Sequence, residues 1–184
     1  MKLLVYGSRD FGRVVRDLAQ TCGHHFVGFV DDLYEGAHVL GNYGAVKSLY
    51  PPGSAGMVIA IGYGHLEARW KIFRKVVADG YEVPTLIHDR AYVRSPEGIG
   101  RGALIMAGAI VDVSVKLGEL TVLWPGAVVN HDSVIGANTF ISPNATVCGF
   151  VEVGESCFVG AGAVIVDHRS VPDHAFVKAG DVFH

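Results

Sequence analysis

One short segment, VVNHDSVIG at residues 128–136, places an imidazole directly beside a carboxylate. His131 and Asp132 lie in a long run of small apolar residues that otherwise suits only packing. Histidine changes charge near neutral pH, so it can accept a proton from a nucleophile during a reaction. A neighbouring carboxylate can hold the ring in one orientation and stabilise its charged form. The pair therefore predicts general-base chemistry, and an exposed histidine without a role is the alternative that the residues alone leave open.

From residue 87 onward the sequence repeats with a strict period of six. Ile, Leu or Val occupies every sixth position up to 177, and a mostly small residue follows four places later. A fixed short period of this kind is typical of a solenoid. It predicts an all-β left-handed parallel β-helix, a triangular prism in which three hexapeptides form one coil and the aliphatic side chains point inward. A β-sandwich would instead show alternation, with turns every 8–12 residues or so.

This repeat places His131 on the outside of the prism. It follows the inward-pointing Val129 by two positions, and the small Ser133 marks the adjacent corner. Gly149 lies one coil later, in register with His131. Because neighbouring coils are about 4.8 Å apart, the amide of Gly149 is expected to face the same surface, where it can stabilise an oxyanion. The three residues His131, Asp132 and Gly149 are therefore candidates for one catalytic group.

The first 84 residues follow a different pattern, in which strand and helix signals alternate. Three apolar runs predict strands and two segments of helical periodicity predict helices, namely 2–6, 25–32 and 57–62 for the strands, and 11–23 and 65–80 for the helices. The Gly- and Pro-rich stretch 33–56 is expected to be mostly loop. This order predicts an α/β, Rossmann-like (βαβ) domain at 1–84, followed by the β-helix domain at 85–184.

A glycine-rich turn, GSRDFG at residues 7–12, joins the first predicted strand to the first predicted helix. Backbone amides and the helix dipole favour a phosphate group at such a turn. Arg9 stands where dinucleotide-binding turns have their second glycine, so an NAD enzyme is not expected. Asp31 and Asp32 follow the second strand, at the carboxyl edge where α/β sheets bind ligands. These features predict a nucleotide site, although a solvated turn would also explain the two aspartates.

Composition excludes several classes of protein. The chain has 184 residues, of which 50% are hydrophobic and 18% charged, and its net charge is −3. Without a basic surface, nucleic acid is not an expected partner. Cys22, Cys148 and Cys157 show no paired spacing, which indicates free thiols. No apolar run suits a signal peptide or a membrane span, so a cytoplasmic location is expected.

Taken together, these segments resemble the PglD/NeuD-like family of sugar acyltransferases over nearly the whole chain. Five stretches carry the resemblance, which are VYGSRDFGRVV, FVDD, IAIGYGHLEAR, PTLIHDRAYV and AVVNHDSVIG. The resemblance implies an acetyl-CoA-dependent N-acetyltransferase acting on the amino group of a nucleotide-linked (UDP, GDP or dTDP) amino-deoxy sugar in glycan biosynthesis. It also implies a homotrimer with active sites between neighbouring β-helices and no metal ion.

The resemblance further implies roles for individual residues. His131 would be the general base, Asp132 its supporting carboxylate and Gly149 the oxyanion donor. The nucleotide sugar would be bound by residues of the glycine turn and of the next two strand ends, namely Gly7, Ser8, Arg9, Asp10, Phe11, Gly12, Asp31, Asp32, Gly62 and Glu67. Acetyl-CoA would be bound by Phe140, Ala161, Ala179 and Gly180.

The sequence departs from the family at Trp124, because many members have Asn at this place, seven residues before the catalytic histidine. It also stops at GDVFH, where members usually continue with a G-x-P-A-K segment, so a truncated chain is one expectation.

Three other functions stay open at this point. A sugar O-acetyltransferase of the sialic acid type would use the same residues on a hydroxyl group. A zinc hydro-lyase of the γ-carbonic anhydrase kind shares the β-helix, but it needs histidines in register over two coils. His131 and His168 miss that register by one residue. A sensor that binds a nucleotide sugar and uses the β-helix only for trimerisation is the non-catalytic alternative.

Overall fold

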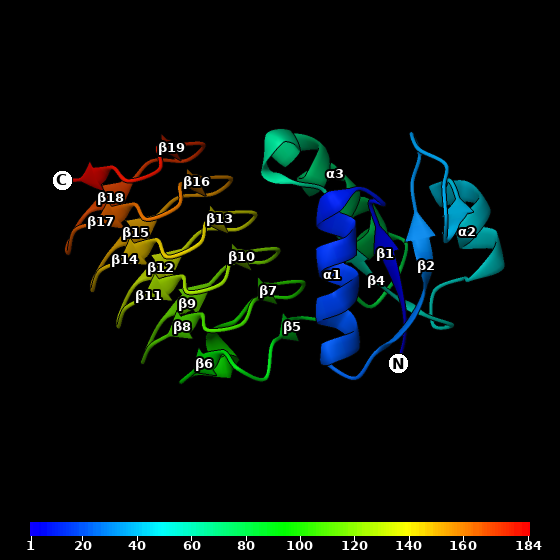
Figure 1. Ribbon diagram of the computed structural model, residues 1–184, viewed down its shortest axis with the longest axis horizontal. Coiled ribbons are helices and arrows are strands. Elements are labelled where there is room, and N and C mark those ends of the chain that lie inside the picture. Colours follow the sequence, from blue (N-terminus) through cyan, green and yellow to red (C-terminus); the bar gives the residue numbers. More distant parts are fainter. The chain divides into compact units, whose positions relative to one another are not determined.

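The structure, a computed structural model, describes residues 1–184, and the chain divides into two units, Met1–Pro84 and Thr85–His184. Figure 1 shows that the first unit contains the main helices and a small sheet, whereas the second is a stack of short strands that ends at the C-terminus. The fold class expected from the sequence, an α/β unit followed by a left-handed β-helix, is confirmed.

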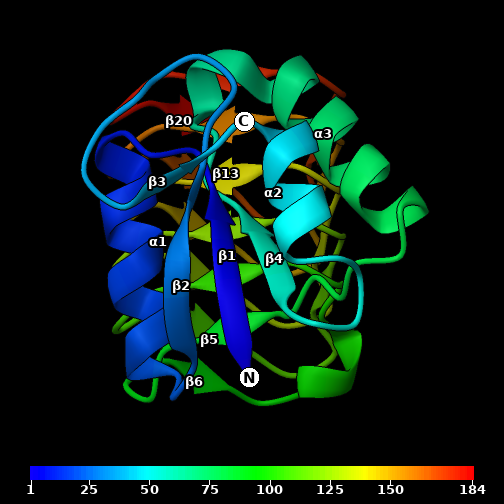
Figure 2. The same ribbon diagram turned by 90° about the vertical axis from the view of Figure 1, so that its right-hand side faces the viewer.

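The first unit is built on a parallel sheet of four strands in the order β3-β2-β1-β4. Its strands are β1 (Lys2–Tyr6), β2 (His25–Val30), β3 (Val39–Gly41) and β4 (Gly56–Ile59). Figure 2 shows β1 between β2 and β4. The central position explains why β1 reads as a continuous apolar run, since Leu3, Leu4 and Val5 are all 0% exposed.

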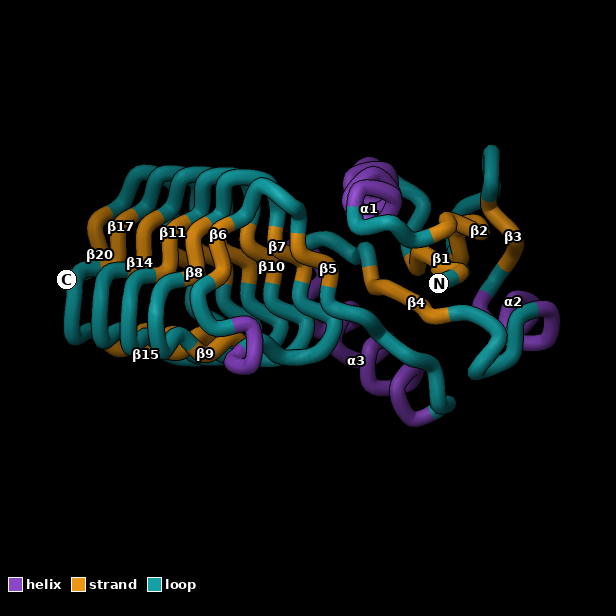
Figure 3. Tube along the Cα trace, turned by 90° about the horizontal axis from the view of Figure 1, so that it is seen from below, coloured by secondary structure: helices purple, strands orange, loops and turns teal.

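Two long helices and one short helix cover the sheet. They are α1 (Asp10–Thr21), α2 (Tyr43–Leu49) and α3 (Leu66–Ala78), and a 3-10 turn at Tyr63–His65 precedes α3. Figure 3 shows α1 on one face of the sheet and α2 and α3 on the other. Both long helices end just before a glycine with positive φ, Gly23 at 78° and Gly80 at 90°. The longest helix has 13 residues, and no helix is long and apolar enough to cross a membrane.

The expectation that residues 33–56 are mostly loop was wrong for part of that stretch, because it contains β3 and α2. The side chain of Asn42 caps α2 by accepting a hydrogen bond from the Ala45 amide at 2.9 Å. Tyr43 and Val46 are the residues that this helix buries. A helix of seven residues shows little periodicity, and the Gly and Pro residues on both sides concealed it.

The second unit is a parallel β-helix of about five turns, whose strands form three walls. The first wall contains β5 (Leu86–Ile87), β7 (Leu104–Ile105), β10 (Val122–Leu123), β13 (Phe140–Ile141), β16 (Phe158–Val159) and β19 (Phe176–Val177). The second wall contains β6 (Tyr92–Val93), β8 (Ile110–Val111), β11 (Val128–Val129), β14 (Thr146–Val147), β17 (Val164–Ile165) and β20 (Val182–Phe183). The third wall contains β9 (Lys116–Leu117), β12 (Val134–Ile135), β15 (Glu152–Val153) and β18 (Ser170–Val171). A 3-10 turn lies at Pro96–Gly98.

The period of six corresponds to the core of this unit. In every wall strand up to β19 the second residue is the predicted aliphatic, and these residues form one continuous apolar cluster inside the prism. Val129, Ile135 and Ile141, which come from three different walls, are all 0% exposed. Each strand pairs with the strand one coil later, as Val128 does with Thr146. The core therefore fixes which residues face outward on each wall.

Small polar residues at the corners link one coil to the next. The buried Ser133 donates from Oγ to the Cys148 carbonyl at 2.8 Å and accepts from the Val151 amide at 3.1 Å. Thr139 does the same at the next corner, donating to the Gly154 carbonyl at 3.0 Å and accepting from the Cys157 amide at 3.0 Å. Each hydroxyl thus holds both sides of the turn in the following coil.

We predict that Thr139→Val lowers the free energy of unfolding by about 1–3 kcal/mol, because it keeps the side-chain shape but leaves the buried Cys157 amide without an acceptor. Urea unfolding measures the change. Thr21→Val is the matched control, since this threonine is exposed at the end of α1, and it should stay within about 0.5 kcal/mol of the unmodified protein. Equal effects at both positions would contradict the proposed role of the corner hydroxyl.

Candidate active site

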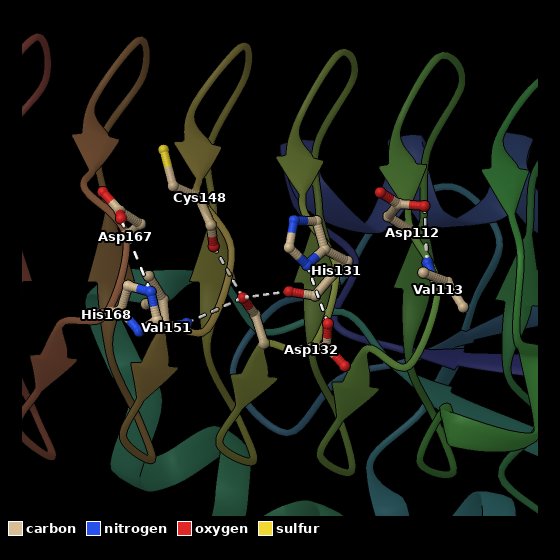
Figure 4. Close-up of polar contacts among 9 residues, drawn as sticks. Asp112, Val113, His131, Asp132, Cys148, Val151, Asp167 and His168 are labelled. Carbon is tan, nitrogen blue, oxygen red and sulfur yellow. Dashed lines mark hydrogen bonds and ion pairs between the residues drawn. The ribbon is translucent and has the colours of Figure 1, made fainter.

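His131 lies at the corner between β11 of the second wall and β12 of the third wall. Its side chain is 46% exposed, and its Nδ1 atom is 2.9 Å from Oδ2 of Asp132. Neighbouring residues of a strand point apart, but Asp132 has a φ of 58°, and this left-handed conformation turns the chain at the corner. Figure 4 shows the carboxylate beside the imidazole ring. When Nδ1 carries the proton and donates it to Asp132, Nε2 is left free to accept another proton.

Gly149 lies directly against the imidazole, one coil later. A Cβ atom on this glycine would be 2.8 Å from Cε1 and 2.9 Å from Nε2 of His131, so only glycine fits here without displacing the ring. The flanking amides are used within the chain, because Cys148 donates to Ile165 and Phe150 donates to His131. Gly149 is buried and its amide has no acceptor in the chain, so a bound group is a candidate partner for this donor. The structure thus brings His131, Asp132 and Gly149 together.

Phe150 is a neighbour of His131 that the sequence interpretation missed. Its ring centroid is 5.2 Å from that of His131, and the two planes meet at 86°. On its other side it stacks on His168, with centroids 4.8 Å apart and planes 3° from parallel. The available signal was the coil register, since Phe150 occupies the corner position that Asp132 occupies one coil earlier. The side chain of His168 is 68% exposed.

The predicted nucleotide site lies at the carboxyl edge of the sheet in the first unit. Tyr6, the last residue of β1, pairs with Val30 on one side and with Ile59 on the other. The segments that follow β1, β2 and β4 therefore start at the same edge, and strand order changes direction between β1 and β4. Such a switch point is where open α/β sheets bind ligands.

The glycine turn is closely packed at this edge. Gly7 has a φ of 108°, and a Cβ atom there would be 2.6 Å from the Ala60 carbonyl oxygen. A Cβ atom on Gly12 would collide with the carbonyl oxygen of Gly7. Both glycines thus let the start of α1 approach the end of β1, which places the N-terminus of the helix at the edge where an anion is favoured.

Asp31 holds the turn in place. Its Oδ2 atom accepts from the Ser8 amide at 2.9 Å and from the Ser8 hydroxyl at 2.6 Å. Its Oδ1 atom accepts from the amides of Leu33 and Tyr34, both at 3.0 Å. Burial by itself would raise the pKa of Asp31, but these hydrogen bonds outweigh it and lower the pKa. The carboxylate predicted to contact a ligand is occupied by the protein's own donors.

Asp32 is also bound within the unit. Its Oδ2 atom accepts from the Tyr6 hydroxyl at 2.5 Å, and its Oδ1 atom accepts from the Tyr43 amide at 2.7 Å. Burial raises the pKa of Tyr6, and the hydrogen bond to Asp32 and its charge add to this effect. Both aspartates therefore join segments of the sheet edge, which their position in the sequence did not reveal.

The other predicted residues of this site lie around the same edge. The Arg9 guanidinium lies 4.5 Å from the centroid of the Tyr34 ring, a cation–π contact. Asp10 forms an ion pair with Arg13 at 2.6 Å, on the surface of α1. Phe11 is partly buried in the first turn of α1. Gly62 caps the 3-10 turn that follows β4, and Glu67 is exposed in the first turn of α3.

The predicted acetyl-CoA residues are only partly brought together. Ala161 and Ala179 are exposed at the corner between the first and second walls, and the Gly180 amide donates to the Ala161 carbonyl at 2.9 Å. Phe140 lies in β13 with its side chain 1% exposed, so its ring does not join this surface. Within one chain, this corner and the His131 corner lie on opposite sides of the second wall.

No three His, Cys, Asp or Glu side chains gather closely enough anywhere in the chain to hold a metal ion. The two histidines that a two-coil metal site would need lie on opposite sides of the Phe150 ring.

Two family models match the chain. One describes the PglD N-terminal domain and matches residues 2–76, and the other describes the bacterial transferase hexapeptide (six repeats) and matches residues 132–167.

Solved structures are similar over both units. The acetyltransferase domain of PglB from Neisseria gonorrhoeae FA1090 is 29% identical, with a TM-score of 0.91 over 100% of this chain and 91% of that chain. The same domain in complex with acetyl coenzyme A is 28% identical, with a TM-score of 0.77 over 98% and 97% of the two chains. A histidine-to-asparagine variant of perosamine N-acetyltransferase from Caulobacter crescentus, in complex with CoA and GDP-perosamine, is 26% identical, with a TM-score of 0.79 over 97% and 93%.

We predict that Asp31→Asn destabilises the first unit by about 1–3 kcal/mol at pH 7, because the amide cannot accept all four hydrogen bonds. A lowered pKa in the folded state gives stability that is present above the unfolded carboxyl pKa of about 4 and is lost as pH falls through the folded value. The difference between the two proteins should therefore shrink below about pH 4. Melting temperatures of the variant and of the unmodified protein, each taken at pH 7 and below about pH 4, measure this difference in stability.

Asp10→Asn is the control, since this carboxylate is 91% exposed and pairs only at the surface, where an ion pair contributes little. A difference between Asp31→Asn and the unmodified protein that is independent of pH would contradict the role given to the carboxylate.

Proposed function

Because the chain belongs to the PglD/NeuD-like sugar acyltransferase family, we propose that it transfers an acetyl group from acetyl-CoA to the amine of a nucleotide-linked amino-deoxy sugar, with His131 as general base. The reaction class itself, an acetyl-CoA-dependent sugar acetyltransferase, follows from the family. The observation that carries the finer proposal is the cluster of His131, Asp132 and Gly149 on one corner of the prism. An amine acceptor is supported by the similar perosamine N-acetyltransferase, which was solved with CoA and GDP-perosamine.

The chemistry of the cluster suits acetyl transfer to an amine. The acceptor nitrogen attacks the thioester carbonyl, and Nε2 of His131 takes the proton that this nitrogen releases. Asp132, at 2.9 Å from Nδ1, stabilises the imidazolium ion that results. The free Gly149 amide donates to the oxyanion of the tetrahedral intermediate. When the intermediate collapses, the thiolate of CoA leaves with the proton held by His131, and the amide product remains.

The nucleotide part of the acceptor is assigned to the carboxyl edge of the sheet. The N-terminus of α1 suits a diphosphate because the helix dipole favours negative charge there, and Arg9 supplies a positive charge beside it. Since the carboxylates of Asp31 and Asp32 are occupied, we infer that they shape this site and leave base and ribose recognition to backbone groups.

We infer that the complete site needs a second copy of the chain. The corner predicted to bind acetyl-CoA and the His131 corner lie on either side of the second wall. If three copies turn this wall toward a common axis, the acetyl-CoA corner of one copy lies next to the His131 corner of its neighbour. The outer face of the second wall is suited to such burial, with Tyr92 55%, Ile110 39% and Val182 51% exposed. The third wall presents Lys116, Glu152 and Ser170 and one exposed apolar residue, Val134.

The function is tested by release of free thiol from acetyl-CoA in the presence of UDP-, GDP- and dTDP-linked 4-amino and 3-amino sugars, with sialic acid beside them. We expect release with at least one nucleotide-linked amino sugar. Release with sialic acid alone would favour O-acetyl transfer, and binding of a nucleotide sugar without any release would favour a sensor.

We predict that His131→Asn lowers kcat by about 10²–10⁴-fold, because the amide cannot accept the proton of the attacking amine. The fold should not change, since the imidazole is exposed at a corner and contributes nothing to the core. Steady-state kinetics and circular dichroism check the two expectations. His174→Asn, an exposed histidine at the corner between the third and first walls, is the matched control and should retain turnover. Full turnover by His131→Asn would remove this residue from the mechanism.

We predict that Ile110→Glu converts the trimer into monomers and lowers turnover with it, because the charge would be buried between copies of the second wall. Light scattering coupled to gel filtration measures the mass. Val134→Glu places the same charge at a residue that is 40% exposed on the third wall, and this control should remain trimeric and active. An active monomer would show that one chain contains the complete site.

A further inference from the structure

Phe150 has a backbone conformation that does not suit its side chain. Its φ is 57°, in the left-handed region, and the same corner position has φ values of 60° at Ser114, 58° at Asp132 and 56° at His168. Short polar residues and glycine adopt this conformation readily, whereas a bulky aromatic residue there is a genuine outlier. The ring is also 49% exposed, so burial in the core does not explain its presence. Leu120 has the same conformation, with a φ of 62°, but it is 0% exposed and its burial accounts for it. Phe150 lacks that explanation, so the contacts of its exposed ring have to supply one.

The contacts of the ring indicate what that explanation is. Phe150 meets the His131 imidazole nearly at a right angle, with 5.2 Å between centroids, an edge-to-face geometry that aromatic rings favour. The imidazole is therefore bounded by three groups, the Asp132 carboxylate at Nδ1, the Gly149 backbone against its face, and the Phe150 ring. The parallel stack on His168 at 4.8 Å holds the Phe150 ring itself in place.

We propose that Phe150 is a positioning residue, which fixes the orientation of the His131 ring so that Nε2 points to the reacting amine. The proposal rests on the function of His131 as base. The imidazole can change its orientation only by rotation about its Cα–Cβ and Cβ–Cγ bonds. The hydrogen bond to Asp132 restrains this rotation weakly, because that side chain is itself 42% exposed, and Gly149 bounds only one side of the ring. The Phe150 ring removes that freedom, and a misplacement of about 1 Å at a reacting group is enough to lower a rate by about 10²-fold.

The strain is measured apart from the ring contacts by comparing Phe150→Ala with Phe150→Gly. Both variants remove the ring, but only alanine keeps a side chain in the left-handed region. Phe150→Gly is therefore expected to melt about 2–4 °C above Phe150→Ala. The control is the same two substitutions at His174, an exposed corner residue with a φ of 61°. His174→Gly should also melt above His174→Ala by a similar difference, while the turnover of both variants stays unchanged. A glycine variant no more stable than the alanine variant at position 150 would show that the backbone there is not strained and would overturn that part of the proposal.

Turnover tests the positioning itself. Phe150→Ala and Phe150→Gly should both lower kcat by about 10–100-fold, with KM for acetyl-CoA and for the acceptor changed by less than about twofold. Phe150→Tyr keeps an aromatic ring and should restore most of the rate. Unchanged kcat in the alanine variant would overturn the proposal. A raised KM with unchanged kcat would also overturn it, because the ring would then bind substrate rather than orient the base.

The His131→Asn background separates this inference from the proposed function. There, Phe150→Ala should have no further effect on the residual rate, because the group that it positions is absent. If His131→Asn is itself fully active, the proposed base is wrong. If His131→Asn is inactive while Phe150→Ala is fully active, only the role of Phe150 is wrong.

A spectroscopic measurement reports the ring contact without any turnover. The NMR signals of the His131 ring protons should be displaced by the ring current of Phe150 in the unmodified protein and in Phe150→Tyr, and should move toward free-histidine values in Phe150→Leu. Signals that do not respond to the loss of the ring would contradict the contact.

Discussion

The parallel hydrogen-bonded ladder between coils is the constraint on which the β-helix and its candidate site depend. It sets each residue against the one a full coil later, as in the pairs Val128 with Thr146 and Val134 with Glu152. The inward aliphatic residues keep this register, because a shift by one residue would expose them. His131 and Gly149 are one coil apart. The aliphatic core takes no part in the reaction, but by fixing the register it places the imidazole against Gly149.

Much of this arrangement could be predicted from the sequence because it depends on a period. The aliphatic positions determine the walls, the walls determine which residues face outward, and the coil length puts Gly149 beside His131. In the α/β unit, β1 and α1 were likewise predictable. Both show clear apolar patterns, and α1 ends before Gly23. A regular spacing can be recognised in a sequence because the same pattern recurs in every repeat.

The features that could not be predicted depend on backbone torsions and hydrogen bonds between distant segments. Asp31 and Asp32 were expected to face a ligand, but Ser8, Tyr6 and the Tyr43 amide occupy their oxygens. Two consecutive aspartates in a sequence do not indicate which distant residues will donate hydrogen bonds to them. Phe150 was overlooked for a related reason, since a hexapeptide pattern describes which wall a residue follows and not how its side chain leaves a corner with positive φ.

The coil register also determines which genetic changes the β-helix can tolerate. A single inserted residue between β12 and β14 would move every later side chain by one place, which would turn aliphatics outward and replace Gly149 by a neighbour beneath His131. A whole inserted coil would instead lengthen the prism and leave each wall intact. Substitutions at exposed corners can therefore alter this surface during evolution without disturbing the core. Short insertions and deletions in the walls would disrupt the register and are not tolerated.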